Sequence, residues 1–253
     1  MEYVALGRSN LLVSRIAFGA YGLQDVSSNE YASTLVQQAY TGGINFFDTT
    51  HSKSQSEKML GYSIQDIREN IILSTRTSAD TPKLIQCELD ESLTALNCDY
   101  IDLYQLENLS FVPKENSSDG IYKTLKMAKE SGKIRHIGYC TDSFQLAKEA
   151  IESKLYETIQ FPFNMLVSNE TWELVKLCEQ HDVGFLAMQP LCGGIITDIP
   201  LAYGFFQQFE NVIPLWGIQT EEELQQILYF QAHPPIVDEK FKEDEEKIRS
   251  FFA

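Results

Sequence analysis

Four charged side chains in the first half of the chain have the types needed for acid–base chemistry and anion binding. Asp48 ends a short apolar run, Lys53 follows it in a polar loop, and Arg76 and Glu107 each follow a later apolar run. A carboxylate or an amine can exchange protons with a substrate, and a guanidinium can hold an anion. His51 lies in the same loop as Lys53 and is a further candidate acid or base. These groups form a site only if the fold brings the ends of the runs together.

Short β-rich runs alternate with amphipathic helical patterns along the chain. The runs predict strands at 16–19, 44–48, 71–75, 101–106, 135–139, 157–161, 184–188 and 212–216. Helices are expected at 30–40, 56–65, 82–96, 120–131, 144–153, 169–181, 202–209 and 221–230. This alternation favours one (β/α)8 TIM-barrel domain over residues 1–253. A doubly wound sheet is disfavoured because residues 19–22 do not fit the glycine-rich nucleotide fingerprint. Residues 234–253 predict a further helix that packs across the barrel or the start of the chain.

In such a barrel the carboxyl ends of the strands meet at one mouth, where catalytic residues gather. Asp48, Lys53, Arg76 and Glu107 would then face each other. We expect Asp48 to pair with Arg76, and Lys53 to pair with Glu107. Unpaired buried charges cost several kcal/mol, so two matched pairs indicate a maintained polar site.

Each candidate also has a structural explanation. Lys53 is a general base or Schiff-base nucleophile, or else a solvated loop lysine. Glu107 is a general acid or base, or only a partner for a neighbouring cation. Arg76 clamps an anion or only neutralises an acid. His51 reaches the mouth or lies on the surface, and Cys140 is a nucleophile or a small buried residue.

Several long runs resemble the aldo/keto reductases. They are GINFFDTTHSKSQSEKMLG (43–61), DYIDLYQLEN (99–108), GKIRHIGYCTDS (132–143), QFPFN (160–164) and GIQTEEELQQIL (217–228). The resemblance covers nearly the whole chain. It implies that family's barrel, with a β-hairpin at the N-terminus.

The same resemblance implies a catalytic tetrad of Asp, Tyr, Lys and His, with NADPH delivering hydride. Position by position, Asp48 is kept. Lys53, Arg76 and Glu107 stand where the tyrosine, lysine and histidine are expected.

The positions that the resemblance assigns to the cofactor have also changed. Cys140 and Thr141 replace a Ser-Asn pair, whereas Gln160 is kept. Glutamates occupy positions 221–223, at a helix start that would otherwise attract a phosphate. We therefore expect no cofactor. NADP(H) is possible but has degraded binding motifs, and Gln160, Cys140 and Thr141 would contact it.

These changes favour a non-redox enzyme, such as a lyase, isomerase, dehydratase or cyclase, acting on a small carbonyl or anionic substrate. One alternative is a non-catalytic binding or scaffold protein on the same fold. A second alternative is an NAD(P)H-dependent aldo/keto reductase with an atypical tetrad.

Composition narrows the partners. Twenty basic and thirty-six acidic residues give a net charge of −16, which argues against nucleic acid and anionic membranes. No secretory signal or membrane-spanning run is evident, and the five cysteines are scattered without metal-ligand spacing. We expect a cytoplasmic protein with a small-molecule substrate and no metal, as a monomer or homodimer.

Overall fold

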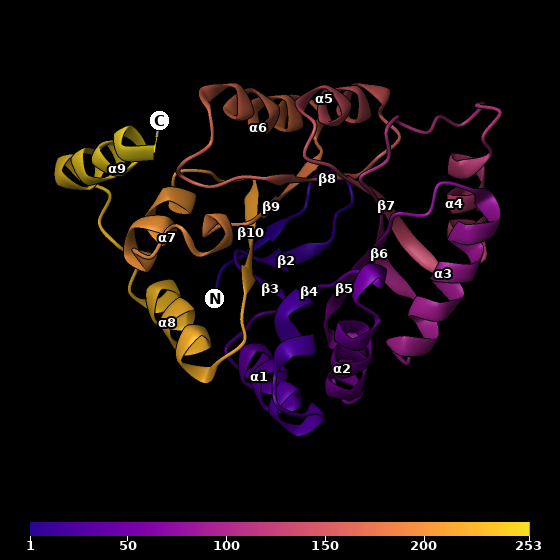
Figure 1. The fold of residues 1–253 in the computed structure, drawn as a ribbon, viewed down its shortest axis with the longest axis horizontal. Coiled ribbons are helices and arrows are strands. Elements are labelled where there is room, and N and C mark those ends of the chain that lie inside the picture. The colour runs from indigo at the N-terminus through magenta and orange to yellow at the C-terminus, as the bar shows by residue number, and fades with distance from the viewer. Residues whose placement is uncertain (253) are drawn as a thin grey trace.

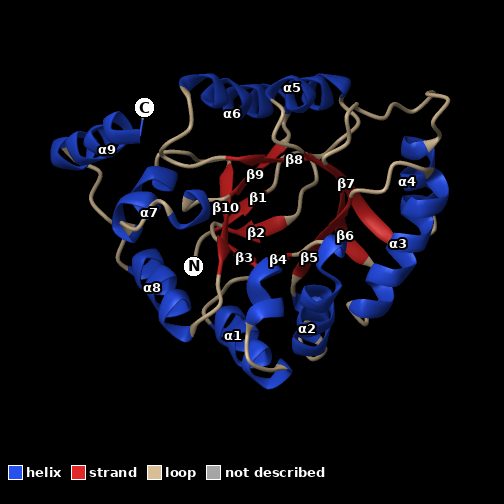
Figure 2. Cartoon of the chain, in the orientation of Figure 1, coloured by secondary structure: helices blue, strands red, loops and turns tan. Residues whose placement is uncertain are grey.

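The barrel predicted from the sequence is confirmed by a computed structural model, which describes residues 1–252. Eight parallel strands close in the order β10-β3-β4-β5-β6-β7-β8-β9 (Figure 2). Their bounds are β3 (Ala17–Gly19), β4 (Phe46–Asp48), β5 (Ile72–Thr77), β6 (Ile101–Glu107), β7 (Ile134–Cys140), β8 (Thr158–Pro162), β9 (Gly184–Met188) and β10 (Val212–Gly217).

Helices surround this ring of strands (Figure 1). They are α1 (Asn29–Thr41), α2 (Ser54–Ile64), α3 (Pro82–Ala95), α4 (Ile121–Glu130), α5 (Phe144–Ser153), α6 (Asn169–His181), α7 (Ile199–Gln207), α8 (Glu221–Ala232) and α9 (Glu239–Phe252). Short 3-10 turns, η1 (Ala20–Asp25) and η2 (His51–Lys53), follow β3 and β4. Side-chain caps fix the starts of several helices, because a hydroxyl oxygen accepts an otherwise unpaired backbone N–H. Ser28 caps α1 and Thr81 caps α3 in this way.

Strand β5 runs past its predicted end. The sequence places Arg76 after the strand, but Arg76 pairs with Gln105 and Thr77 pairs with Leu106 in the β5–β6 ladder. Both residues of β5 are buried. The longer strand builds Arg76 into the barrel wall, which limits the positions its guanidinium can take.

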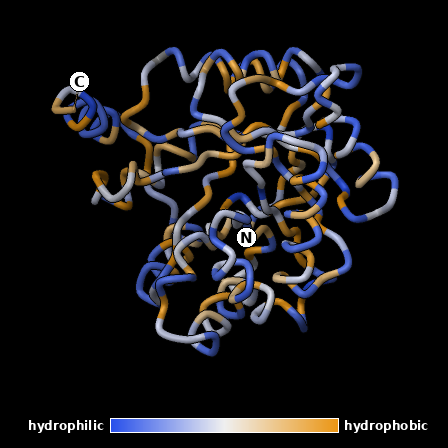
Figure 3. The backbone as a smooth tube through the Cα atoms, turned by 45° about the vertical axis from the view of Figure 1, so that its right-hand side comes forward, coloured by the Kyte–Doolittle hydropathy of each residue, from blue (hydrophilic) through white to orange (hydrophobic). Residues whose placement is uncertain are grey.

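The sequence predicted that the C-terminal helix packs across the barrel or on the start of the chain. In the structure, α9 packs against α7 instead. Its buried Phe241 lies against α7, where a Cβ added to Gly204 would come within 2.4 Å of the ring. Gln208, which follows α7, donates to Glu245 of α9. Helix α9 therefore extends the outer helical layer near α7 and away from the barrel axis (Figure 1). Its colours in Figure 3 are mostly those of hydrophilic residues.

A hairpin of β1 (Tyr3–Ala5) and β2 (Leu12–Ser14) closes the N-terminal end of the barrel. Figure 2 shows it inside the ring of strands. Leu6 and Val13 of this segment join Phe46, Leu103 and other inward-facing residues in one buried cluster. With this end plugged by apolar side chains, access from solvent is left to the C-terminal mouth.

The barrel interior changes from apolar at this floor to polar near the mouth. Ile213 and Leu215 of β10 face the floor cluster. Closer to the mouth the buried side chains include Ser74, Gln105 and Gln160. Within residues 1–252 no helix is long and apolar enough to cross a membrane.

Candidate functional site

One arginine joins two acids at the mouth of the barrel. Asp48 ends β4, Arg76 lies in β5, and Glu107 ends β6. Arg76 Nη1 lies 2.5 Å from Asp48 Oδ2, and Arg76 Nε lies 2.7 Å from Glu107 Oε1. Nη1 also donates to the Thr49 carbonyl at 2.9 Å. The predicted pair of Asp48 and Arg76 is confirmed, and Glu107 joins it as a third member.

Because this cluster is buried, each of its charges needs an opposite charge beside it. Asp48 is 3% exposed and Arg76 is 7% exposed. Burial raises the pKa of Asp48, while the charge and hydrogen bonds of Arg76 oppose that rise. Burial alone would lower the pKa of Arg76, but Asp48 and Glu107 raise it, so the guanidinium stays charged. Removing one partner from a buried ion pair costs about 3–5 kcal/mol, so each member holds the others in place.

The remaining nitrogen of Arg76, Nη2, is available to a ligand. It donates to no group within the described part of the chain. It is also absent from the buried polar atoms that lack a partner there, so it retains some exposure to solvent. The cluster therefore presents a rigidly held N–H donor with a positive charge to whatever enters the barrel.

Lys53 does not form the predicted pair with Glu107. The second oxygen of Glu107 accepts instead from Thr50 Oγ1, at 3.1 Å. Lys53 Nζ lies over the ring of Tyr21, 5.2 Å from its centroid, and forms no ion pair among residues 1–252. The prediction fails because one guanidinium can bridge two carboxylates and a hydroxyl fills the remaining lone pair. Lys53 is left as a half-buried cation beside the mouth.

His51 is turned away from this cluster. Its ring nitrogens lie near side chains of α2 and α3, with Nδ1 3.2 Å from Ser92 Oγ and 3.6 Å from Glu57 Oε2. Nε2 lies 3.4 Å from Glu91 Oε2. The structure therefore does not bring His51 together with the other predicted catalytic residues.

A buried amide network lies beneath the cluster, and two of its members, Gln105 and Ser74, were not predicted from the sequence. Gln105 Nε2 donates to Gln160 Oε1 at 2.6 Å and to Ser74 Oγ at 3.1 Å, and it approaches Asp48 Oδ1 at 3.5 Å. Gln105 lies two residues before Glu107 in β6, so both side chains point to the same face of the strand. That alternation was a usable signal for Gln105.

Cys140 and Thr141 lie at the end of β7 beside Gln160 of β8. Cys140 is 1% exposed, and burial raises the pKa of its thiol, so it is a neutral, buried group and a poor nucleophile. The Thr141 backbone N–H donates to the Gln160 carbonyl, and its hydroxyl oxygen accepts from Ser143. Neither side chain offers acid–base chemistry. No cluster of three or more His, Cys, Asp or Glu residues in the described part of the chain could hold a metal ion.

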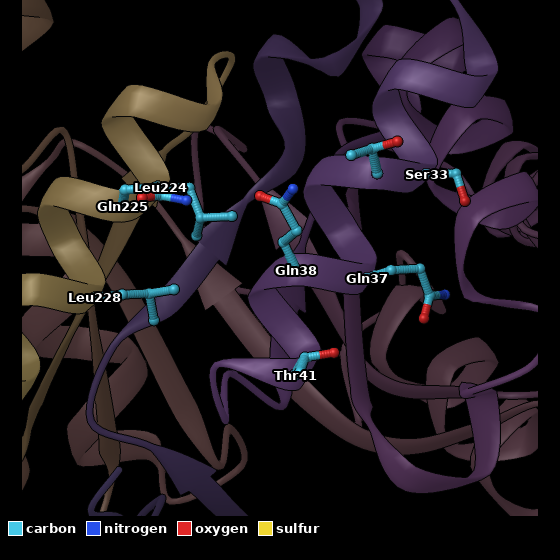
Figure 4. Close-up of a pocket in the computed structure, with 8 residues that line it drawn as sticks. Ser33, Gln37, Gln38, Thr41, Leu224, Gln225 and Leu228 are labelled. Atoms are coloured by element: carbon cyan, nitrogen blue, oxygen red, sulfur yellow. The ribbon is translucent and has the colours of Figure 1, made fainter.

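A groove of about 580 Å³ lies outside the barrel, between α1 and α8 (Figure 4). Its lining consists of Ser33, Thr34, Gln37, Gln38, Thr41, Leu224, Gln225 and Leu228. None of these eight side chains is an acid, a base or a thiol. The groove therefore does not compete with the mouth as a place for acid–base chemistry.

Comparison with known proteins agrees with this geometry. The model of the aldo/keto reductase family matches residues 15–208. An uncharacterized oxidoreductase of Bacillus subtilis, YqkF, is 29% identical over 78% of this chain and 67% of its own length. The NADH-specific methylglyoxal reductase of Escherichia coli is 23% identical over 78% of this chain and 69% of its own. The alignments thus span about two thirds of these relatives.

A solved structure matches almost the whole fold. The holo form of an aldo-keto reductase from Bacillus halodurans superposes with a TM-score of 0.83, at 20% identity. The match covers 98% of this chain and 96% of the other. At this level of identity the match supports the fold, including the closed barrel.

Two predictions made from the sequence are wrong. The favoured non-redox reaction is contradicted because the relatives are named oxidoreductases and reductases. The expectation that no nicotinamide cofactor binds is contradicted as well, by an NADH-specific relative and a holo-form neighbour in fold. Both errors came from treating each changed tetrad position as a loss of hydride chemistry, although Arg76 still pairs with Asp48 and supplies a cation there.

The chain is therefore interpreted as an enzyme, and the names of its relatives do not support the alternative of a non-catalytic scaffold. Its barrel closes around a buried Asp–Arg–Glu cluster that faces the mouth. Since the family model matches well over half of its 253 residues, this chain belongs to the aldo/keto reductase family.

Proposed function

We propose that this protein is a nicotinamide-dependent oxidoreductase that reduces a small aldehyde or ketone at the C-terminal mouth of its barrel. The observation that carries the proposal is Arg76, whose guanidinium is fixed by Asp48 and Glu107 with Nη2 left partly exposed to solvent. A preorganised donor aimed at a carbonyl oxygen stabilises the negative charge that develops there during reduction. The names of the relatives support the same reaction class.

The residues near β8 fit the nicotinamide end of such a cofactor. Gln160 is 1% exposed, and its Oε1 is held by Gln105. Its Nε2 donates to no described group and is absent from the buried atoms that lack a partner, so it is not fully sealed from solvent. An amide N–H in this position suits the oxygen of a carboxamide. Gln105 Oε1 is buried near Gly138 of β7 and has no partner in the described part of the chain.

Farther round the rim, the loop after β9 fits a pyrophosphate. Gly193 and Gly194 have φ values of +66° and +93°, and no atom lies within 4 Å of the place where a Cβ would stand on either. Open glycine backbone lets a phosphate approach closely. Loops after the seventh and eighth strands of such barrels commonly bind phosphate, and β9 and β10 hold those places in the barrel here.

The next loop, after β10, favours NADH over NADPH. Helix α8 begins there with three glutamates, and Glu223 Oε2 accepts from the backbone N–H groups of Gln219 and Thr220, at 2.8 and 3.1 Å. Glu221 is held in place by Gln38 Nε2, at 2.7 Å. The donors that would hold a 2′-phosphate are thus taken by carboxylates. A carboxylate can accept from a ribose 2′-hydroxyl but repels a phosphate.

Gln160 and the loops after β9 and β10 would hold NADH, which when bound would supply the hydride for the carbonyl carbon. Arg76 Nη2 donates to the carbonyl oxygen and remains charged throughout, since Asp48 and Glu107 hold it in that state. Lys53 gives its ammonium proton to the same oxygen as the alcohol forms, and it regains a proton from solvent. Hydride and proton together add two hydrogens across the carbonyl, so the reaction balances.

The test is reduction of small aldehydes by the purified protein with NADH, followed by the loss of absorbance of the reduced nicotinamide. Lys53→Met is expected to lower kcat by about two orders of magnitude, the usual size of one general acid's contribution. Lys58→Met removes an exposed lysine from α2 and serves as the matched control. Absence of both cofactor binding and reduction in the unmodified protein would sink the proposal. Equal losses in the two variants would remove Lys53 from it.

A further inference from the structure

We propose that His51 is a positioning residue whose protonated ring anchors the Lys53 segment to α2 and α3. The inference rests on the proposed function only in assigning Lys53 the proton transfer. The anchoring itself is a structural claim that can be tested without turnover.

The ring of His51 sits in a niche made by two helices. The Nδ1 atom lies 3.2 Å from Ser92 Oγ of α3 and 3.6 Å from Glu57 Oε2 of α2. The Nε2 atom lies 3.4 Å from Glu91 Oε2, also of α3. Both nitrogens of the ring therefore face acceptors, which suits an imidazolium because it carries a proton on each.

The turn η2 is thus held from both sides. Thr50, one residue before His51, donates to Glu107 of the catalytic cluster at 3.1 Å. His51 ties the outer side of the same turn to α3. Lys53 ends the turn and projects over Tyr21. Release of either tether would let Lys53 move relative to Arg76.

Glu57 makes the anchor depend on charge. Its side chain is fully buried, and its Oε1 accepts from Thr75 Oγ1 of β5 at 2.7 Å. Its Oε2 has no hydrogen-bond partner in residues 1–252, and the ring of His51 is the cationic group beside it. A buried carboxylate without a counter-charge is costly. A neutral His51 would leave Glu57 in that condition.

Within residues 1–252, the charges with the largest effect on His51 belong to acids. They are Glu57 of α2 and Glu88 and Glu91 of α3, while the neighbouring strand β5 contributes neutral threonine hydroxyls. The Glu57 carboxylate, 3.6 Å away, is the main cause that raises the pKa of His51 above its ordinary value; burial opposes the rise, and the charges of Glu88 and Glu91 add to it. The anchor is therefore complete below the ordinary histidine pKa and is lost as pH rises through the raised pKa.

Hydrogen exchange of the backbone amides in residues 50–54 tests the anchor directly. In the unmodified protein, protection is expected to fall as pH rises through the titration of the His51 ring, measured by NMR, after correction for the intrinsic rate. In His51→Gln, protection is expected to be low at every pH. His51→Lys keeps a positive charge, so it is expected to restore the protection of these amides, and this protection should not fall as pH rises. Protection that does not follow the ring titration would overturn the inference.

Kinetics then link the anchor to catalysis. With NADH and a small aldehyde, His51→Gln is expected to lower kcat on the order of tenfold, the scale of a small misplacement of a reacting group. NADH binding should change less than about twofold, because Gln160 lies elsewhere on the rim. His136→Gln removes another histidine that is paired to a glutamate and serves as the control. It should leave the dependence of kcat on pH unchanged. A kcat of His51→Gln equal to that of the unmodified protein would overturn the link. If the unmodified protein reduces nothing, the proposed function fails, whereas the exchange data still decide the anchor.

Discussion

Replacing Arg76 by Met should destabilise the protein strongly, and the loss should depend on pH. The substitution keeps most of the side-chain volume but leaves Asp48 and Glu107 without their shared cation. Asp48 is 3% exposed and Glu107 has a side chain that is 17% exposed, so solvent cannot replace the guanidinium at Asp48. Breaking a buried pair in this way costs about 3–5 kcal/mol at neutral pH.

The pH dependence follows from the acids left behind. Burial already raises the pKa of Asp48, and Arg76 is the main opposing influence, so its removal raises that pKa further. When the pKa of a carboxyl group is higher in the folded protein than in the unfolded chain, the group lowers the free energy of unfolding at every pH above the unfolded pKa. The penalty falls as pH drops and the buried form takes up a proton. The difference in unfolding free energy between Arg76→Met and the unmodified protein should therefore shrink between about pH 7 and pH 4.

Urea denaturation at a series of pH values measures this difference. Lys133→Met is the control, since the Lys133 side chain is 46% exposed and that of its partner Asp90 is 59% exposed. Exposed pairs contribute about 0–1 kcal/mol, so the control should stay within that range. A penalty for Arg76→Met below about 1 kcal/mol at neutral pH, or one that does not change with pH, would refute the reasoning.

Three further predictions follow from other parts of the structure. Hydrogen bonds from His136, the Ile137 backbone and Lys129 outweigh burial and lower the pKa of Glu157 to about 2, so Glu157→Gln should cost about 2–3 kcal/mol at neutral pH in urea denaturation. This cost should vanish as pH falls toward the lowered pKa of Glu157. A cost that stays constant with pH would contradict the lowered pKa. By calorimetry, Glu223→Gln should bind NADPH about tenfold more tightly with little change for NADH. Glu222 is also exposed but does not bond to the loop backbone in the described structure, so Glu222→Gln should alter neither affinity. If the unmodified protein bound NADPH more tightly than NADH, the preference for NADH inferred from these glutamates would be wrong. Gly7→Ala should lower the free energy of unfolding by more than about 2 kcal/mol, because φ at Gly7 is +50° and the new Cβ would meet Gly184 N at 2.3 Å. Gly132→Ala, at φ +80° with open space around it, should lose only about 1 kcal/mol, and equal losses would show that the contact is unimportant.

Much of the fold could be predicted because its periodicity is local. Strand β9 (Gly184–Met188) and helix α5 (Phe144–Ser153) have the bounds that the sequence predicts. The end of β5 was missed because Arg76 is polar, and its place in the ladder depends on pairing with Gln105 of the next strand. A pattern along one chain segment carries no information on that partner.

The site was predictable only in part. The rule that strand ends share one rim gathered Asp48, Arg76 and Glu107 correctly. It did not show the direction of a loop side chain, so His51 and Lys53 were both assigned to the mouth, although His51 faces α3. Their catalytic roles stay predictions, as do the cytoplasmic location and the monomeric or dimeric state.

The hairpin that closes the barrel floor has a consequence for synthesis on the ribosome. Arg8 donates to the carbonyls of Tyr156 and His181, and β3 completes the ring only by pairing with β10 (Val212–Gly217). The hairpin and β3 are therefore synthesised before the later segments with which they pair. Until then β3 exposes an unpaired strand edge, which invites pairing with other chains. That liability lasts until β10 has left the exit tunnel and can pair with β3.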